Sequence, residues 1–210
     1  MLEGIQVLCH SSIRIQKNTT IYFDPFQISQ DYNDADIVFI THDHYDHYSE
    51  EDLKRVVKSD TIVVAPIDLK ERLLACGFQM EQIVLVEPNQ IYQVKGIEFH
   101  TIPAYNTNKA FHKKEYGWVG YLLTLEGITY YIAGDTDITE ENKKVHCDVA
   151  FVPVGGTYTM TYEEAANLVN QIHPKMVIPI HYGRIVGTKE DGKKFSKLLD
   201  SDITCQIFLS

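Results

Sequence analysis

Residues 39–49 read FITHDHYDHYS and follow an apolar run that is typical of a strand. His42, His44, Asp46 and His47 lie within six residues there, at the end of the predicted strand. In an extended or turning backbone, His42 and His44 point the same way and can chelate one ion. Asp46 and His47 then face a neighbouring ion. A polar surface loop is the alternative, but chance rarely gathers four such side chains.

Three further motifs follow the pattern of a known family. They are IYFDP with Asp24, YYIAGDTD with Asp135, and VIPIHYG with His181. Together with His42-x-His44-x-Asp46-His47 they resemble the metallo-β-lactamase fold superfamily, in the same order along essentially the whole chain. The segments LCHSSIRI, PVGGTYTMTYEEA and IPIHYG resemble its branch of small lactonase-like and phosphodiesterase-like metal-dependent hydrolases. The resemblance is specific for the fold and the metal site, and weak for the substrate.

The resemblance implies an α+β fold, a four-layer αββα sandwich, with residues 1–210 forming a single domain. It also implies two divalent metal ions, with zinc expected first and manganese or iron as alternatives. The expected ligands are His42, His44, Asp46, His47, Asp135 and His181, with Asp135 bridging the two ions. We expect Asp46 to be catalytic as well, by orienting the attacking hydroxide and carrying its proton.

One position departs from the family pattern. The superfamily usually has a histidine after the strand that reads HTIPAYN, and this chain has Asn106 there. An amide oxygen is a poorer ligand than imidazole for these ions. Either Asn106 ligates weakly, or His112 of the same loop supplies the imidazole, or the first ion keeps only His42 and His44. We favour His112 because the loop is long enough to fold back, with an exposed loop residue as the alternative.

Other polar residues are expected around the centre. We expect Asp24 to organise the metal-binding loop rather than to ligate, and His10 to be a neighbouring donor or a structural hydrogen-bond partner. Lys109, Lys113, Lys114 and Arg184 lie in loops that should surround the site. They favour an anionic small substrate, unless they are ordinary solvated loop charges.

The predicted function is hydrolysis. A metal-bound hydroxide would attack a small anionic ester, lactone or phosphodiester. An iron-dependent redox enzyme on the same fold is one alternative. A metal-binding module that lost turnover through Asn106 is the other.

Composition limits the class of protein and its partners. The 210 residues carry 19 Lys and Arg against 29 Asp and Glu, a net charge of −10, which argues against duplex nucleic acid as a partner. No apolar run is long enough to span a bilayer, and the N-terminal residues do not resemble a signal peptide. The four cysteines are far apart and form no CxxC pair, as in reduced proteins. We therefore expect a cytoplasmic protein without a membrane partner. Its oligomeric state is open.

Hydrophobic patterning predicts alternating strands and helices. The expected strands are Ile5–Leu8, Thr20–Phe23, Ile37–Ile40, Thr61–Ala65, Ile83–Val86, Ile97–Ile102, Val119–Leu125, Ile128–Ala133, Val149–Val152, Met176–Ile180 and Thr204–Leu209. The expected helices begin after Ser49 and cover Leu69–Ala75, Thr161–Val169 and Glu190–Leu199. Capping boxes are predicted at Ser49 with Asp52 and at Thr161 with Glu164.

Overall fold

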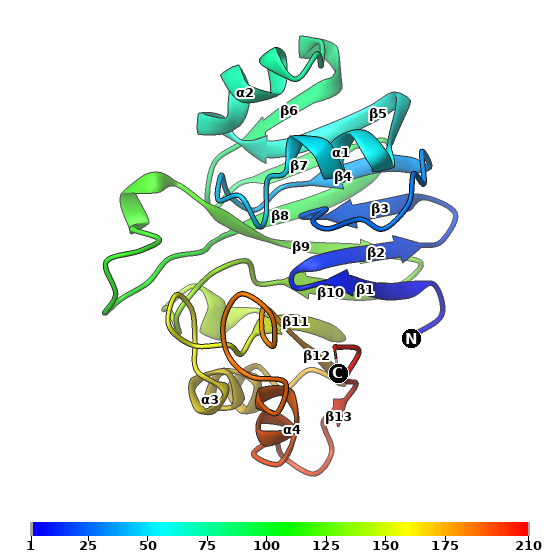
Figure 1. Ribbon diagram of the computed structural model, residues 1–210. Coiled ribbons are helices and arrows are strands. Elements are labelled where there is room, and N and C mark those ends of the chain that lie inside the picture. The colour runs from blue at the N-terminus through cyan, green and yellow to red at the C-terminus, as the bar shows by residue number, and fades with distance from the viewer. Residues whose placement is uncertain (1, 210) are drawn as a thin grey trace. The chain divides into compact units, whose positions relative to one another are not determined.

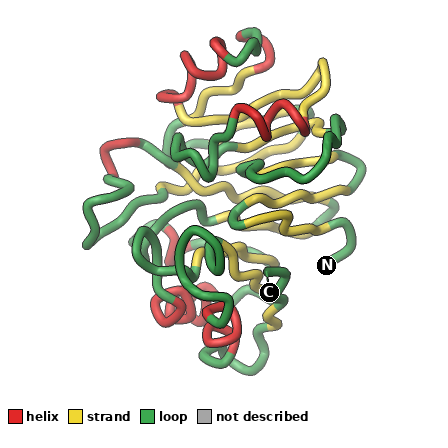
Figure 2. The backbone as a smooth tube through the Cα atoms, in the orientation of Figure 1, coloured by secondary structure: helices red, strands yellow, loops and turns green. Residues whose placement is uncertain are grey.

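The structure is a computed structural model that describes residues 2–209 (Figure 1). It contains two compact units, residues 2–87 and residues 88–209, called here the N-terminal and C-terminal units. Each unit holds one mixed β-sheet with its own helices (Figure 2). No helix within residues 2–209 has both the length and the apolar composition needed to cross a membrane.

The N-terminal unit is built on a six-stranded sheet in the order β1-β2-β3-β4-β5-β6. Its first three strands are antiparallel neighbours, and β3 to β6 run parallel. The strands are β1 (Ile5–Cys9), β2 (Ser12–Gln16), β3 (Thr20–Phe23), β4 (Ala35–Phe39), β5 (Val57–Pro66) and β6 (Ile83–Val86). The helices are α1 (Glu50–Val56) and α2 (Lys70–Ala75), with short 3-10 turns at Ile67–Leu69 and Met80–Gln82. Leu53 of α1 and Leu73 of α2 pack on the sheet residues Val38 and Val63 in one buried cluster.

Helix α1 begins where the sequence predicted, directly after the histidine-rich loop. Ser49 is its N-cap, and the Ser49 hydroxyl accepts a hydrogen bond from the backbone N–H of Asp52. The predicted capping box is only half formed, because the Asp52 carboxylate accepts from the Ser49 hydroxyl, at 2.7 Å, and not from the Ser49 backbone N–H. The same carboxylate also accepts from the backbone N–H groups of Gln27 and Ile28, at 2.9 and 2.8 Å. Asp52 therefore ties the β3–β4 connection to the start of α1.

The C-terminal unit has a seven-stranded sheet in the order β13-β12-β11-β10-β9-β8-β7. Strands β7 to β10 are antiparallel, and β10 to β13 are parallel. The strands are β7 (Ile91–Val94), β8 (Ile97–Pro103), β9 (Val119–Leu125), β10 (Ile128–Ile132), β11 (Val149–Pro153), β12 (Met176–Ile180) and β13 (Thr204–Cys205). The helices are α3 (Tyr162–Ile172) and α4 (Asp191–Ser196), with 3-10 turns at Lys114–Tyr116 and Asn142–Lys144.

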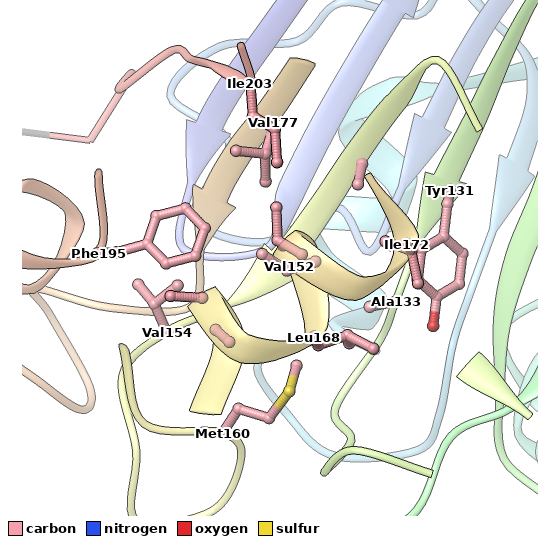
Figure 3. Packing of buried hydrophobic residues seen from close by; sticks show 14 of the residues in the cluster. Tyr131, Ala133, Val152, Val154, Met160, Leu168, Ile172, Val177, Phe195 and Ile203 are labelled. Carbon is pink, nitrogen blue, oxygen red and sulfur yellow. The ribbon is translucent and has the colours of Figure 1, made fainter. Parts of the chain in front are cut away.

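The core of the C-terminal unit lies between this sheet and its helices. Figure 3 shows Leu168 of α3 and Phe195 of α4 beside Val152 and Val177, which come from two neighbouring parallel strands. Burying such side chains contributes roughly 1.5–3 kcal/mol each. This packing holds β11 and β12 in place, and with them the loops that follow these two strands.

Most predicted elements are confirmed, and the differences have local causes. The capping box of α3 forms as expected, with Thr161 and Glu164 bonding to each other's backbone N–H. Strands β2 and β7 were not predicted. Strand β2 was missed because Arg14 interrupts its apolar pattern, although Asp34 and Tyr22 satisfy the buried guanidinium. The predicted last strand reduces to Thr204–Cys205, and α4 is shorter than expected at both ends.

Candidate metal centre

The N-terminal unit presents its histidines in the loop between β4 and α1. Nε2 of His42 lies 3.2 Å from Nδ1 of His44, so the two rings aim nitrogens at one point. Two nitrogens bound to one tetrahedral zinc at about 2.0–2.1 Å stand about 3.3 Å apart. The spacing of these two nitrogens therefore fits a shared ion.

The buried carboxylate of Asp24 holds this loop from behind. Its Oδ1 accepts from the backbone N–H of Thr41 at 2.8 Å, and its Oδ2 accepts from the Thr41 hydroxyl at 2.7 Å. The same Oδ2 lies 2.7 Å from Nδ1 of His47, which leaves the Nε2 edge of that ring for another partner. Burial raises the pKa of the Asp24 carboxyl, and the contacts to His47 and Thr41 act in the opposite direction. Asp24 thus orients a histidine ring in the way that carboxylates support metal-binding histidines.

Asp46 lies between two imidazoles of the same unit. Its Oδ2 is 3.3 Å from Nε2 of His10 and 3.7 Å from Nε2 of His47. His10 belongs to the tight turn between β1 and β2 and has a positive φ of 51°. The structure therefore brings the predicted residue His10 to the carboxylate that we expect to be catalytic.

The C-terminal unit gathers a second group of donors around Asp135. Nε2 of His112 lies 3.2 Å from Oδ2 of Asp135, and Nε2 of His181 lies 3.1 Å from the same oxygen. All three side chains are buried. Two imidazole nitrogens therefore lie within 3.2 Å of one carboxylate oxygen.

The strands of the C-terminal unit set these positions. Asp135 follows β10 and the glycine turn at Gly134, and His181 directly follows β12. Because β10, β11 and β12 run parallel, both residues emerge at the same edge of the sheet. His112 arrives from the long connection between β8 and β9, which Figure 2 shows as a loop with one short helical turn.

Asn106 lies beside His112 and has no contact with Asp135 among the described interactions. Its side-chain nitrogen Nδ2 donates to the backbone carbonyl of Tyr158 at 2.7 Å and lies 3.2 Å from Nδ1 of His112. Its backbone N–H donates to the carbonyl of His112 at 2.8 Å. The sequence offered Asn106 or His112 as a ligand of the first ion. Of these two residues, His112 has a ring nitrogen next to Asp135.

The predicted cationic rim is partly neutralised within the C-terminal unit. Lys109 is paired with the buried carboxylate of Asp137. Lys114 pairs with Glu141 at 2.8 Å. Lys113 and Arg184 are exposed. The structure thus places all three predicted substrate-binding residues, Lys113, Lys114 and Arg184, at exposed positions, with Lys114 paired with Glu141.

The donors fit divalent ions of the zinc, manganese and iron group. Each unit offers buried imidazoles together with a carboxylate, the mixed nitrogen and oxygen set that these ions accept. The donor separations within each unit, from 3.1 to 3.7 Å, are those of neighbouring ligands on one ion. Each group therefore has the donor chemistry of a metal-binding site.

Sequence reasoning missed the residues that hold the ligand loops. Thr41 links Asp24 to the histidine loop, and its position directly before the motif was the available signal. Asp137 and Glu141 fasten the long loop of His112 through Thr107, Lys109 and Lys114. Asp137 stands in the motif GDTD, only two residues after Asp135.

Comparison with known proteins covers nearly the whole chain. The family model described as "Beta-lactamase superfamily domain" matches residues 4–181. A UPF0173 metal-dependent hydrolase from Lysinibacillus sphaericus is 31% identical, over 91% of this chain and 90% of its own length.

Solved structures show the same fold. A crystal structure of a protein from Parabacteroides distasonis has a TM-score of 0.84 and 31% identity, covering 98% of this chain and 93% of that one. CmlA, a diiron β-hydroxylase from Streptomyces venezuelae, has a TM-score of 0.75 at 16% identity, over 96% of this chain and 52% of that one. The similarity to CmlA, at 16% identity, concerns the fold alone. These similarities confirm the α+β sandwich fold that the sequence motifs predicted.

Proposed function

We propose that this chain, which belongs to the β-lactamase superfamily and to its UPF0173 family of metal-dependent hydrolases, hydrolyses a small anionic ester, lactone or phosphodiester with two bound metal ions. The observation that carries the proposal is the approach of His112 and His181 to one oxygen of Asp135. The family model matches residues 4–181, which include every proposed ligand.

The proposed ligands follow the family motifs. We assign His42, His44 and His112 to one ion, Asp46, His47 and His181 to the other, and Asp135 to both. Zinc is the first candidate because imidazole dominates this set. When bound, such ions act as Lewis acids and lower the pKa of coordinated water towards neutrality.

The residues of the chain then handle the proton and the substrate. Asp46 accepts the proton of the attacking water, with His10 3.3 Å from the accepting oxygen to hold the carboxylate in place. Asp24 keeps the His47 ring in one orientation through the 2.7 Å contact to Nδ1. An anionic group of the substrate is bound by the exposed cationic side chains of Lys113, Lys114 and Arg184. Glu141 balances part of the charge of Lys114.

Metal content is the first test of this proposal. The protein is purified without added metal and its ions are counted by mass spectrometry. About two zinc or manganese ions per chain support the hydrolase. Two iron ions with absorbance in the visible region would favour the redox alternative, and no bound ion in the protein or after zinc addition would exclude both.

Activity is then measured on matched esters, lactones and phosphodiesters that differ in charge. The variants Asp46→Asn and Asp135→Asn should lower kcat by at least 10²-fold. Lys113→Ala should raise KM for anionic substrates and leave KM for neutral ones unchanged. An equal effect on both substrate groups would exclude the anionic preference. Full metal occupancy without turnover of any substrate would favour the binding module.

A further inference from the structure

The loop from Asn106 to His112 closes on itself. The backbone N–H of Asn106 donates to the His112 carbonyl at 2.8 Å, so the two ends of this seven-residue segment are joined. His112 has a left-handed backbone conformation with φ of 51°, which is uncommon for residues other than glycine. The closure and this conformation direct the His112 ring towards Asp135.

The Asn106 side chain contacts the ring on the edge opposite to Asp135. Asn106 Nδ2 is 3.2 Å from His112 Nδ1, whereas His112 Nε2 is 3.2 Å from Asp135. The Asn106 amide is itself anchored, because its Nδ2 donates to the Tyr158 carbonyl at 2.7 Å. Its Oδ1 is buried and has no hydrogen-bond partner within residues 2–209. An acceptor buried in this way is costly unless some state of the protein supplies a donor.

A metal ion on Nε2 would create that donor. A neutral imidazole that binds a metal through Nε2 carries its proton on Nδ1, and this N–H needs an acceptor. Rotation of the Asn106 amide about its Cβ–Cγ bond exchanges Nδ2 and Oδ1, so that Oδ1 accepts from the Nδ1–H of His112. Because the Tyr158 carbonyl oxygen lies 2.7 Å from the present position of Nδ2, it has to move away from the rotated amide, which loses that hydrogen bond.

We propose that Asn106 is a positioning residue for His112, whose Nδ1–H it accepts when a metal ion occupies Nε2. Asn106 is therefore not a metal ligand in this proposal, although it stands where the family usually has one. The inference rests on the proposed function, in which His112 is a ligand.

Zinc affinity measured in a double-mutant cycle tests the proposal. The dissociation constant of zinc is determined by competition with a chelating dye for the wild type, Asn106→Leu, His112→Ala and the double variant. Asn106→Leu should weaken the zinc site by about 10–100-fold, the usual effect of losing a partner behind a ligand. It should have no further effect in the His112→Ala background, because Asn106 acts through that ring. Equal weakening in both backgrounds would overturn the proposal.

Asn108→Leu is the matched control, since Asn108 lies exposed in the same loop and contacts only Lys109 in the described interactions. Its zinc affinity should equal that of the wild type. Thermal unfolding of the metal-free variants checks that Asn106→Leu folds, and Asn106→Ala provides a smaller replacement with the same expected weakening.

Nuclear magnetic resonance of the histidine rings gives a second readout. Zinc-loaded wild type should show a slowly exchanging Nδ1–H of His112 that disappears in Asn106→Leu. Retention of this signal in the variant would contradict the proposal. A wild type that binds no zinc overturns the proposed function and this inference together, whereas tight binding unaffected by Asn106→Leu overturns the inference alone.

Discussion

The backbone of Gly155 lies against His181 so closely that a β-carbon at residue 155 would stand 2.2 Å from the His181 carbonyl oxygen. Real β-carbons essentially never approach backbone to this distance. Gly155 follows β11, and His181 follows the neighbouring strand β12. The glycine is therefore required by the close approach of two strand ends, one of which carries a proposed ligand.

We expect Gly155→Ala to destabilise the protein by about 1–3 kcal/mol and to reduce its zinc content, because His181 has to move. Gly127→Ala is the control, since residue 127 has a positive φ, of 77°, but a β-carbon added there would meet no atom within 4 Å. It should lower the melting temperature without changing zinc content. Equal zinc content in the two variants would contradict this role for Gly155.

Asp137 should hold the loop of His112 in place. Asp137→Asn removes the charge that pairs with Lys109 and weakens the 2.8 Å hydrogen bond from the Thr107 N–H. We expect a loss of about 1.5–3 kcal/mol in unfolding free energy, as for hydrogen bonds to a charged group. Limited proteolysis should show faster cleavage within residues 104–117.

Glu140→Gln is the comparison for that variant. Glu140 pairs with Lys143 on the surface, where such pairs contribute little. Its proteolysis pattern and melting temperature should match those of the wild type. Similar behaviour of the two variants would mean that Asp137 is only another surface charge.

The thiols of Cys147 and Cys205 should react slowly in the folded protein. Burial raises the pKa of Cys147 to about 12 and that of Cys205 to about 11. At pH 8 only about one Cys147 in ten thousand is then a thiolate, the form that reacts. Titration with a disulfide reagent at pH 8 should label these two cysteines far more slowly than the same chain in denaturant. Rapid labelling of Cys147 in the native state would refute the expectation.

The contact of His173 with Asp202 should make the unfolding free energy fall as the pH rises above the ordinary pKa of histidine. Its Nε2 lies 2.9 Å from Asp202, and this hydrogen bond raises the His173 pKa above its ordinary value near 6.5. A raised pKa in the folded state means that the stabilisation is fully present below that ordinary value and is lost as the pH rises through the folded pKa.

The Asp202→Asn variant isolates this contribution. It should lower the His173 pKa measured by nuclear magnetic resonance. The unfolding free energies of the wild type and the variant, measured in urea, should differ at pH 5.5 and converge by pH 9. Asp200, whose carboxylate lies 3.8 Å from Nδ1 of His173, provides the control Asp200→Asn with a smaller effect. A difference in unfolding free energy between wild type and Asp202→Asn that grows as the pH rises would contradict this prediction.

Strands with continuous apolar runs were predicted to the residue. Thr20–Phe23, Ile83–Val86, Val119–Leu125 and Met176–Ile180 have the predicted bounds. Strands β3 and β12 are buried at every residue, so their apolar composition marks their ends. Strand β2 was missed because its buried Arg14 depends on partners from β3 and the following loop, which no local pattern reveals.

The candidate site also contains residues that local sequence could predict and residues that depend on distant parts of the chain. Spacing within one short segment predicted that His42 and His44 aim at a common point, because local backbone geometry decides it. The place of His112 could only be offered as an alternative. It depends on how a long loop returns to the sheet, and on Asp137 and Glu141, which lie some thirty residues further along the chain.

The contact of His112 with Asp135 has a consequence for the comparison of sequences. The superfamily usually has histidine where this chain has Asn106, so a comparison of that single position would miss the imidazole of His112. The imidazole of His112 lies six residues downstream, in the long loop between β8 and β9. Loss of activity in this family should therefore be inferred from the side chains around the bridging aspartate and not from the identity of one aligned residue.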